Sequence, residues 1–253
     1  MTQARSILGA PPIEVEAVLD IDCDLPAPAD IDALDAAATA ALVGEYPTAR
    51  RRLLSEHQLS AVPGQPVAVT SRQGLQALQY ASLDEKQIVQ FRLNGFSFNM
   101  LAPYSGFGDY LPEIERTWRL FVEISRPVLC RVIRLRFINR IALPLTDGRV
   151  ELDHYLKLAP RLAYDQRLTF VGFFTQHSVE ETATDNQANI VFATQPVEQD
   201  RLPLIFDIEA FKVGDCEPGD WKTISGRVAS LLALKNLVFR NSLTDTCLNL
   251  FQS

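Results

Sequence analysis

The stretch 132–144, which reads VIRLRFINRIALP, carries the side chains best suited to binding a ligand. Arg134, Arg136 and Arg140 fall on one side of an extended strand, and apolar residues fall on the other. Guanidinium groups form paired hydrogen bonds with carboxylates and phosphates. If the sheet is concave, these arginines and Tyr104 would line a groove for an anionic ligand or an acidic peptide.

Two asparagines complete this candidate ligand-binding set. Asn139 interrupts the apolar side of the stretch, and a buried amide without partners costs about 1 to 3 kcal/mol. A structural role, in which Asn139 ties the strand to a neighbouring loop or helix end, explains it better than ligand contact. Asn99 and Tyr104 share the segment FSFNMLAPY at 96–104. The candidate ligand-binding residues are therefore Arg134, Arg136, Arg140, Asn139, Asn99 and Tyr104.

The sequence predicts no catalytic residue, no metal site and no cofactor. His57, His154 and His177 do not lie within ligand spacing of one another or of a cysteine. Asp153 next to His154 could be an orienting carboxylate and a base, but an exposed dipeptide in a helix is the simpler interpretation. The chain also lacks the GxSxG, GxxxxGK[ST] and strand-following GxGxxG motifs. These features favour a protein that is not an enzyme.

The cysteines indicate a reducing compartment. Cys23, Cys130, Cys216 and Cys247 are far apart in the chain and form no CxxC pair. Their apolar surroundings predict reduced core residues rather than a disulfide framework. The first ten residues contain no sustained apolar run, so we expect no signal peptide. No window is long enough for a membrane span, and we expect a cytoplasmic protein without membrane association.

Composition and charge suit an ordinary globular protein. The 253 residues are 47% hydrophobic and 22% charged, with a net charge of -7. This length fits one large domain or two of roughly 120 residues. The acidic balance disfavours a general nucleic-acid-binding protein, although a local arginine-rich face keeps that possibility open. The run Arg50, Arg51 and Arg52 reads better as a solvated linker after a helix than as a phosphate-binding patch.

The pattern of 132–144 recurs near the start of the chain. A shift of 118 residues lays the apolar side of 13–25 on that of the later stretch, so that Val15 matches Ile133. The outer side of the first copy is acidic, whereas that of the second is basic. We therefore predict two structural repeats, each opened by a long strand. If the two opening strands lie side by side, the acidic face of one would meet the basic face of the other. Ion pairs of Glu14 or Glu16 with Arg134 or Arg136 would stabilise that junction by about 0.2 to 1 kcal/mol each.

The remaining periodicities complete an α+β fold. The first half reads as strand 13–25, a helix from Asp30 to before Pro47, strands 66–72, 75–82, 86–93 and 95–101, and a helix between Pro112 and Pro127. The second half reads as the strand at 132–144, a short helix at 152–158, strands 165–177, 187–196 and 203–213, and a final helix after Pro218, Gly219 and Asp220. These are two tandem β-α-βn-α repeats with a mainly antiparallel sheet and helices on one face. The order matches helix-grip or TATA-binding-protein-like topology.

The predicted domain boundaries follow from the same order. Residues 1–10 are expected to be a flexible arm, 11–129 the first repeat and 130–253 the second. The two repeats are expected to form one continuous unit. Oligomeric state is left open.

Four segments resemble a family of sporadically distributed, uncharacterised prokaryotic proteins of similar length. They are PPIEVEAV at 11–18, FSFNMLAPY at 96–104, RLRFINRI at 134–141, and the final helix with its tail Asn241-Ser-Leu-Thr244. The resemblance implies no particular activity. A scattered distribution is typical of genes that travel with mobile or defence islands, including toxin and antitoxin pairs.

Three functional hypotheses remain. The first is a non-enzymatic binding or regulatory protein whose partner is another protein encoded nearby, because no nucleophile, metal or phosphate motif is present. The second is a small-molecule-binding protein or enzyme of the helix-grip type, with a cavity between the sheet and a long helix. The third is a protein that binds nucleic acid through an arginine-rich sheet face.

Overall fold

A single large antiparallel sheet dominates the structure, a computed structural model that describes residues 13–26, 31–60, 68–103, 106–160 and 171–251. Within those ranges it has nine strands in the order β2-β3-β4-β5-β1-β6-β9-β8-β7. Their bounds are β1 Ile13–Asp24, β2 Thr48–Ser60, β3 Ala68–Ala81, β4 Gln87–Arg92, β5 Gly95–Leu101, β6 Leu129–Pro144, β7 Phe174–Glu181, β8 Asn186–Thr194 and β9 Arg201–Cys216. The predicted α+β class and antiparallel sheet are confirmed.

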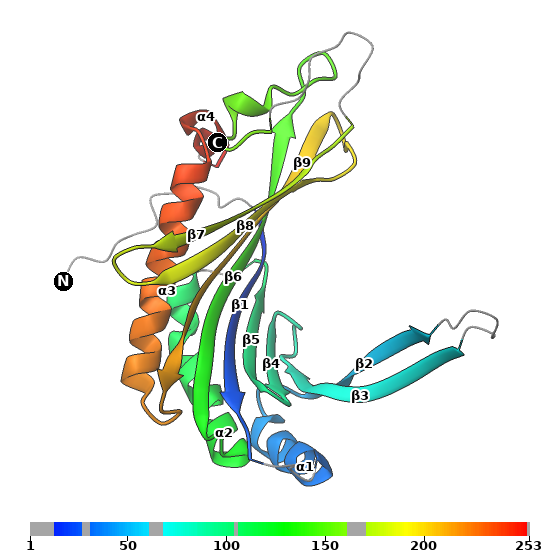
Figure 1. The fold of residues 1–253 in the computed structure, drawn as a ribbon, viewed down its shortest axis with the longest axis vertical. Helices are drawn as coiled ribbons and strands as arrows, with labels where there is room; N and C mark the ends of the chain where they lie inside the picture. Colours follow the sequence, from blue (N-terminus) through cyan, green and yellow to red (C-terminus); the bar gives the residue numbers. More distant parts are fainter. Residues whose placement is uncertain (1–12, 27–30, 61–67, 104–105, 161–170, 252–253) are drawn as a thin grey trace.

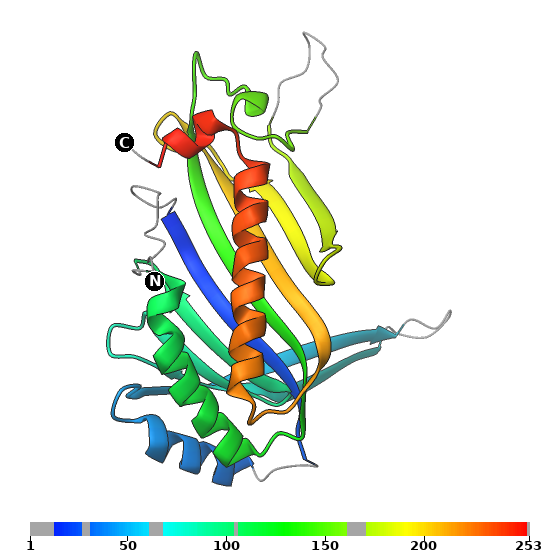
Figure 2. The same cartoon turned by 90° about the vertical axis from the view of Figure 1, so that its left-hand side faces the viewer.

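Four α-helices accompany the sheet in the described ranges: α1 Ile31–Leu42, α2 Leu111–Ser125, α3 Trp221–Ser242 and α4 Asp245–Asn249. Two short 3-10 helices, η1 Phe107–Tyr110 and η2 Leu152–His154, lie in the connections. Figure 2 shows α1, α2 and α3 in front of the sheet, all on the same face. Figure 1 shows the sheet from the side, with β2 and β3 extending away from the helices. None of the described helices is long and apolar enough to cross a membrane.

The two long strands β1 and β6 are neighbours at the middle of the sheet, so the acidic face of one does meet the basic face of the other. They pair antiparallel, with Leu19 opposite Leu135 and Val18 opposite Arg136. Side chains alternate between buried and partly exposed along β6, because successive residues of a strand point to opposite faces. On each outer side of this pair the later strands follow in reverse order of sequence: β5, β4, β3 and β2 beyond β1, and β9, β8 and β7 beyond β6.

One residue of the predicted repeat departs from its match. Val15 is 40% exposed, whereas Ile133 is fully buried. The register between β1 and β6 shifts between Glu14 and Glu16, which is a β-bulge that turns Val15 out of the apolar row. From Ala17 onward the two strands bury their apolar side chains as predicted.

Aromatic and aliphatic side chains hold the helices against the sheet. In α2, Trp118 and Phe121 pack with ring centroids 5.6 and 5.7 Å from that of Phe96 in β5. Trp118 is therefore the core anchor that the sequence predicts, and it is 1% exposed. Asp220 caps the start of α3 by accepting a hydrogen bond from the Thr223 backbone N–H at 3.1 Å.

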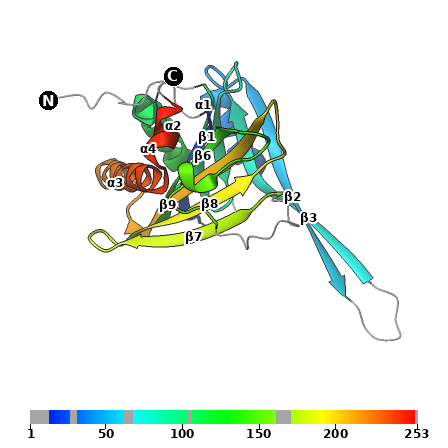
Figure 3. The same cartoon turned by 90° about the horizontal axis from the view of Figure 1, so that it is seen from above.

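The segment between α1 and β4 differs from the prediction. Residues 66–72 and 75–82 were expected to be two strands with a turn at Gly74, but β3 is continuous and Gly74 pairs with Leu54 of β2. The predicted linker at Arg50–Arg52 is part of β2. Only residues 77–81 of β3 pair with β4, so the rest of this hairpin has no third strand, and Figure 3 shows it projecting from the sheet. Most of the β2-β3 hairpin has no third strand beside it. Its sequence therefore lacks the alternation of apolar and polar residues that identifies a strand with one buried face.

Two predictions for the second half are also corrected. The short helix expected at 152–158 is only the single 3-10 turn η2. The strand expected at 165–177 begins at Phe174, and the positions 161–170 lie outside the described residues. The predicted flexible arm at 1–10 lies outside them as well.

Candidate functional site

The side of the sheet away from α1, α2 and α3 is the candidate site, and we call it the open face. Within the described ranges no helix lies over it (Figure 3). In the three central strands β1, β6 and β9 its side chains alternate with the buried row and are Glu16, Val18, Asp20, Asp22, Val132, Arg134, Arg136, Ile138, Arg140, Ile205, Asp207, Glu209, Phe211 and Val213. Charged and apolar side chains are therefore interspersed across it.

Arg134 belongs to a compact ion-pair cluster on the open face. Its guanidinium pairs with Asp22 of β1, and Asp22 also accepts a hydrogen bond of 2.8 Å from Arg92 of β4. Asp20 lies beside this group and accepts a hydrogen bond from Ser97. The charge of Arg134 is thus balanced by carboxylates of the same chain.

Arg136 forms a two-pronged contact with Asp207 of β9. Its Nε and Nη2 atoms donate to the two carboxylate oxygens at 3.0 and 2.6 Å. These hydrogen bonds raise the pKa of Arg136, outweighing the opposing effect of burial, and the nearby Glu209 and Glu16 add to the rise. Arg136 therefore lies among three carboxylates.

Arg140 is also paired. Its Nη2 donates to Glu198 at 2.5 Å and its Nε donates to Gln195 at 3.3 Å, both beyond the end of β8. All three candidate arginines therefore have carboxylate partners within the chain. An anionic ligand would have to compete with them, and the local carboxylates would oppose its approach.

The acidic face of β1 does meet the basic face of β6, but the close ion-pair partners of Arg134 and Arg136 are Asp22 and Asp207, and Glu16 acts on Arg136 only as a nearby charge. Glu16 lies opposite Ile138 in the register, and Arg134 reaches Asp22 rather than Glu16. The difference arises because the sequence does not give the register between β1 and β6, and a change of register alters every cross-strand pair.

Asn99 takes part in a row of hydrogen-bonded side chains that crosses four strands of the open face. Gln79 of β3 donates to Gln90 of β4 at 3.0 Å, Gln90 donates to Asn99 of β5 at 2.6 Å, and Asn99 donates to Glu16 of β1 at 2.6 Å. Gln90 and Asn99 are buried, so this row is an internal polar network. Such satisfied networks rigidify a structure.

Asn139 does not join the open-face group. Asn139 points into the core on the helix side, where its Nδ2 donates to the Phe206 carbonyl of β9 at 3.0 Å. It ties β6 to the next strand, a structural role as predicted, but to a strand rather than to a loop or helix end. Its Oδ1 atom has no hydrogen-bond partner among the described residues. Tyr104 lies outside the described residues.

The space between the sheet and α3 is filled by aromatic rings. Phe192 and Phe206 stack with centroids 4.3 Å apart, and Phe206 stacks on Phe239 of α3 at 5.4 Å. The Nζ of Lys235 lies 3.9 Å from the ring centroid of Phe137. In the sequence, Lys235 has the same helical spacing as the apolar residues of this helix. That position indicates that the lysine is buried.

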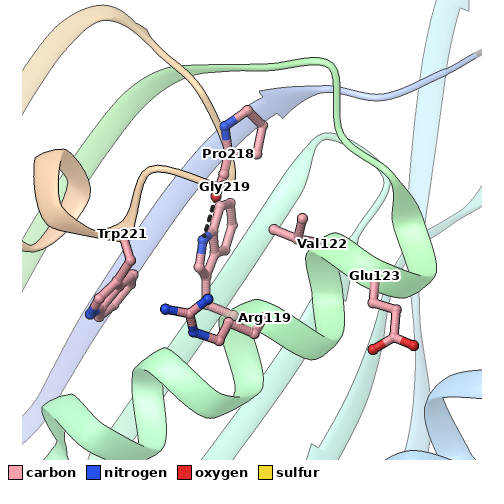
Figure 4. A pocket seen from close by; sticks show the side chains of 7 residues that line it. Arg119, Val122, Glu123, Pro218, Gly219 and Trp221 are labelled. Carbon is pink, nitrogen blue, oxygen red and sulfur yellow. Dashed lines mark hydrogen bonds between the residues drawn. The ribbon is translucent and has the colours of Figure 1, made fainter.

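A shallow cleft of about 190 Å³ lies on the helix side, and sequence reasoning did not predict it. It is formed by the C-terminal half of α2 and the turn before α3, and both Trp118 and Trp221 contribute to its walls. Figure 4 shows Trp221 and Arg119 at its rim. The indole N–H of Trp118 donates to the Pro218 carbonyl at 3.0 Å, so this N–H is not available to a ligand in the cleft.

His154 and His177 belong to no metal-binding group among the described residues. His154 is exposed and lies 3.0 Å from Glu151, and His177 is exposed on β7. No group of three or more His, Cys, Asp or Glu side chains suited to a metal ion occurs among the described residues.

No protein-family model matches this chain, and no curated protein is similar enough to count as a relative. The resemblance carried by the four sequence segments therefore stays a prediction. Function has to be argued from the open face itself.

Proposed function

We propose that this chain is a non-enzymatic binding protein that recognises a partner protein through its open face. The observation that carries the proposal is the composition of that face: paired charges around Arg136 alternate with partly exposed apolar side chains such as Ile138, Phe211 and Val213. Protein interfaces combine apolar contact area with charges that set specificity. Each arginine is paired with a carboxylate of the same chain, so the open face presents fixed ion pairs rather than a positively charged patch.

We further propose that the face is built from two repeats, 11–129 and 130–253, joined as one unit with TATA-binding-protein-like topology. In each half the first strand is central, the last strand of the meander lies beside it, and a long helix follows. That shared order and the matching strand patterns support duplication. The bulge at Val15 is a local difference between the halves.

The partner is proposed to be the product of a neighbouring gene, as in defence or toxin-antitoxin pairs. This rests on the sequence resemblance. A cavity-based, helix-grip function is less well supported, because aromatic rings pack between the sheet and α3. Nucleic-acid binding and capture of an acidic peptide are less well supported because each of the three arginines has an acidic partner.

The test compares two exposed apolar positions on opposite sides of the molecule. Val213 on the open face is 63% exposed, and Leu237 on the outer side of α3 is 49% exposed. The chain is co-expressed with each neighbouring gene product, and the affinity of any pair that co-purifies is measured. Val213→Arg should weaken binding by about ten-fold or more, and Leu237→Arg should leave it unchanged.

Two results would contradict the proposal. The first is that none of the neighbouring products binds, which removes the proposed partner. The second is a loss of affinity in Leu237→Arg but not in Val213→Arg, which assigns binding to the helices instead.

A further inference from the structure

Three cysteines that are distant in sequence meet in one row across the central strands. Cys23 of β1 is directly opposite Cys130 of β6, and Cys130 is directly opposite Cys216 of β9. The Sγ atoms of Cys23 and Cys130 are 3.8 Å apart, although the residues are separated by 107 positions. All three are free thiols. The row lies across the junction of the two halves of the chain.

The three thiols differ in access to solvent. Cys23 and Cys130 are buried, whereas Cys216, near the end of β9, is partly exposed. Burial raises the pKa of Cys216 to about 11, and the Arg227 guanidinium partly opposes this rise. The hydrogen bond with Cys23 and burial raise the pKa of Cys130 far above its usual range. Cys23 and Cys130 are buried and Cys216 is partly exposed, so an oxidant should reach Cys216 first, and the raised pKa of Cys216 makes its reaction slow near neutral pH.

The backbone geometry permits a bond between the two closest thiols. Directly opposite residues of antiparallel strands have Cα atoms about 4.5 to 5.5 Å apart. Disulfides span Cα separations of about 4.4 to 6.8 Å. The pair adjoins a register shift between Asp22 and Cys23, and its two Sγ atoms are already in contact at 3.8 Å, so a small movement would bring them to bonding distance.

We propose that Cys23, Cys130 and Cys216 form an oxidation site, in which a hydroperoxide reacts at Cys216 and the oxidation is passed inward to a Cys23–Cys130 disulfide. The product would join β1 covalently to β6. This assignment does not depend on the binding function of the open face.

The chemistry balances in three steps. The Cys216 thiolate attacks the hydroperoxide, giving a Cys216 sulfenic acid and an alcohol. Cys130 then attacks the Cys216 sulfur, water leaves, and a Cys130–Cys216 disulfide forms. Cys23 attacks the Cys130 sulfur and releases Cys216 as a thiol. In total, two thiols lose two electrons and two protons, and the hydroperoxide is reduced to an alcohol and water.

The test treats the folded, fully reduced chain with an alkyl hydroperoxide and follows its intact mass and its disulfide-linked peptides. The proposal expects the loss of two hydrogens and a peptide that links Cys23 with Cys130. It would be overturned if the thiols stay reduced, if Cys216 accumulates as an oxidised adduct without a disulfide, or if the final product links other cysteines.

Variants separate the roles of the thiols. Cys216→Ala should slow disulfide formation by about ten-fold or more, because the accessible thiol is gone. Cys247→Ala is the matched control, since Cys247 is buried away from the row, and should form the disulfide at the wild-type rate. Equal rates in Cys216→Ala and wild type would disprove the entry role. Because peptide mapping of the unaltered chain tests the pairing directly, a variant that folds poorly does not leave it undecided.

Discussion

Asp22 in β1 and Arg134 in β6 form an ion pair between the two central strands. The same carboxylate pairs with Arg92 of β4 at 2.8 Å, so one acidic side chain connects three strands. The side chains of Asp22, Arg92 and Arg134 are 21%, 17% and 30% exposed, which limits screening by solvent. The Nε of Arg92 already lacks a hydrogen-bond partner among the described residues.

Replacing Asp22 should therefore destabilise the fold. Asp22→Ala leaves two half-buried guanidinium groups without this carboxylate and should lower the free energy of unfolding by about 2 kcal/mol. Urea unfolding followed by tryptophan fluorescence measures the change. Asp215→Ala is the control, because its pair with Arg131 is exposed, and it should cost less than about 1 kcal/mol. Equal losses in the two variants would show that burial of the Asp22 cluster is unimportant.

Removing the amide of Asn139 should cost little. Asn139→Leu loses the hydrogen bond to Phe206 but also removes the unpaired buried Oδ1, so the free energy of unfolding should change by less than about 1 kcal/mol. Asn139→Asp, which places a charge in the core, should lower it by several kcal/mol. Both are measured by urea unfolding at neutral pH. A large loss in Asn139→Leu would mean that the amide has a further partner.

Glu113 in α2 should contribute stability that disappears in acid. Burial raises the pKa of this carboxyl, but hydrogen bonds from Arg116 and Tyr46 outweigh burial and hold it below its model-compound value of 4.5. A depressed folded-state pKa means that the contribution is present above about pH 4.5 and is lost as the pH falls through the folded pKa.

The variant Glu113→Gln tests that dependence. It should lower the free energy of unfolding at pH 7 by about 1 kcal/mol, and the difference from wild type should shrink as the solution is acidified. Glu123→Gln, at an exposed position of the same helix, is the control and should show little difference at any pH. A constant gap between Glu113→Gln and wild type across the acid range would refute this account.

Gly95 should not tolerate a side chain. Its φ is +147°, and an added Cβ would lie 2.1 Å from the Ile21 carbonyl oxygen of β1. Gly95→Ala should cost more than about 3 kcal/mol, because both the backbone and the neighbouring strand must shift. At Gly74 an added Cβ would meet nothing within 4 Å, so Gly74→Ala should be neutral or slightly stabilising. Thermal unfolding by circular dichroism compares the two, and similar midpoints would contradict the prediction.

Elements with a strong local signal were predicted well. The alternation along β6 is nearly complete because one of its faces is buried by the helices along its length. Pro112 in the first turn of α2 and Asp220 before α3 are local helix-start signals, and both helices begin there. The hairpin predicted at Asn94-Gly95 joins β4 to β5, with Leu93 and Asn94 in the turn and Gly95 as the first residue of β5.

The strand β2 and the continuity of β3 through Gly74 were not predicted, for a physical reason. A two-stranded segment that projects from a sheet need not bury one whole face, so its sequence lacks the alternation that identifies a strand. Arg51 is an example: it pairs with Asp32 and Asp35 of α1 and looks in sequence like part of a charged linker. Gly74 looks like a turn but lies within a continuous ladder.

By itself, the sequence determined which side chains are buried and which are charged along each central strand, because strand and helix periods are local properties of the chain. Only the tertiary structure decided which of them meet. The register between β1 and β6, including its bulge, selected Asp22 for Arg134, and the order of β1, β6 and β9 placed Cys23, Cys130 and Cys216 in one row. These side-chain pairings depend on the register between strands that are distant in the sequence. A shift of that register by one residue would change every cross-strand pair.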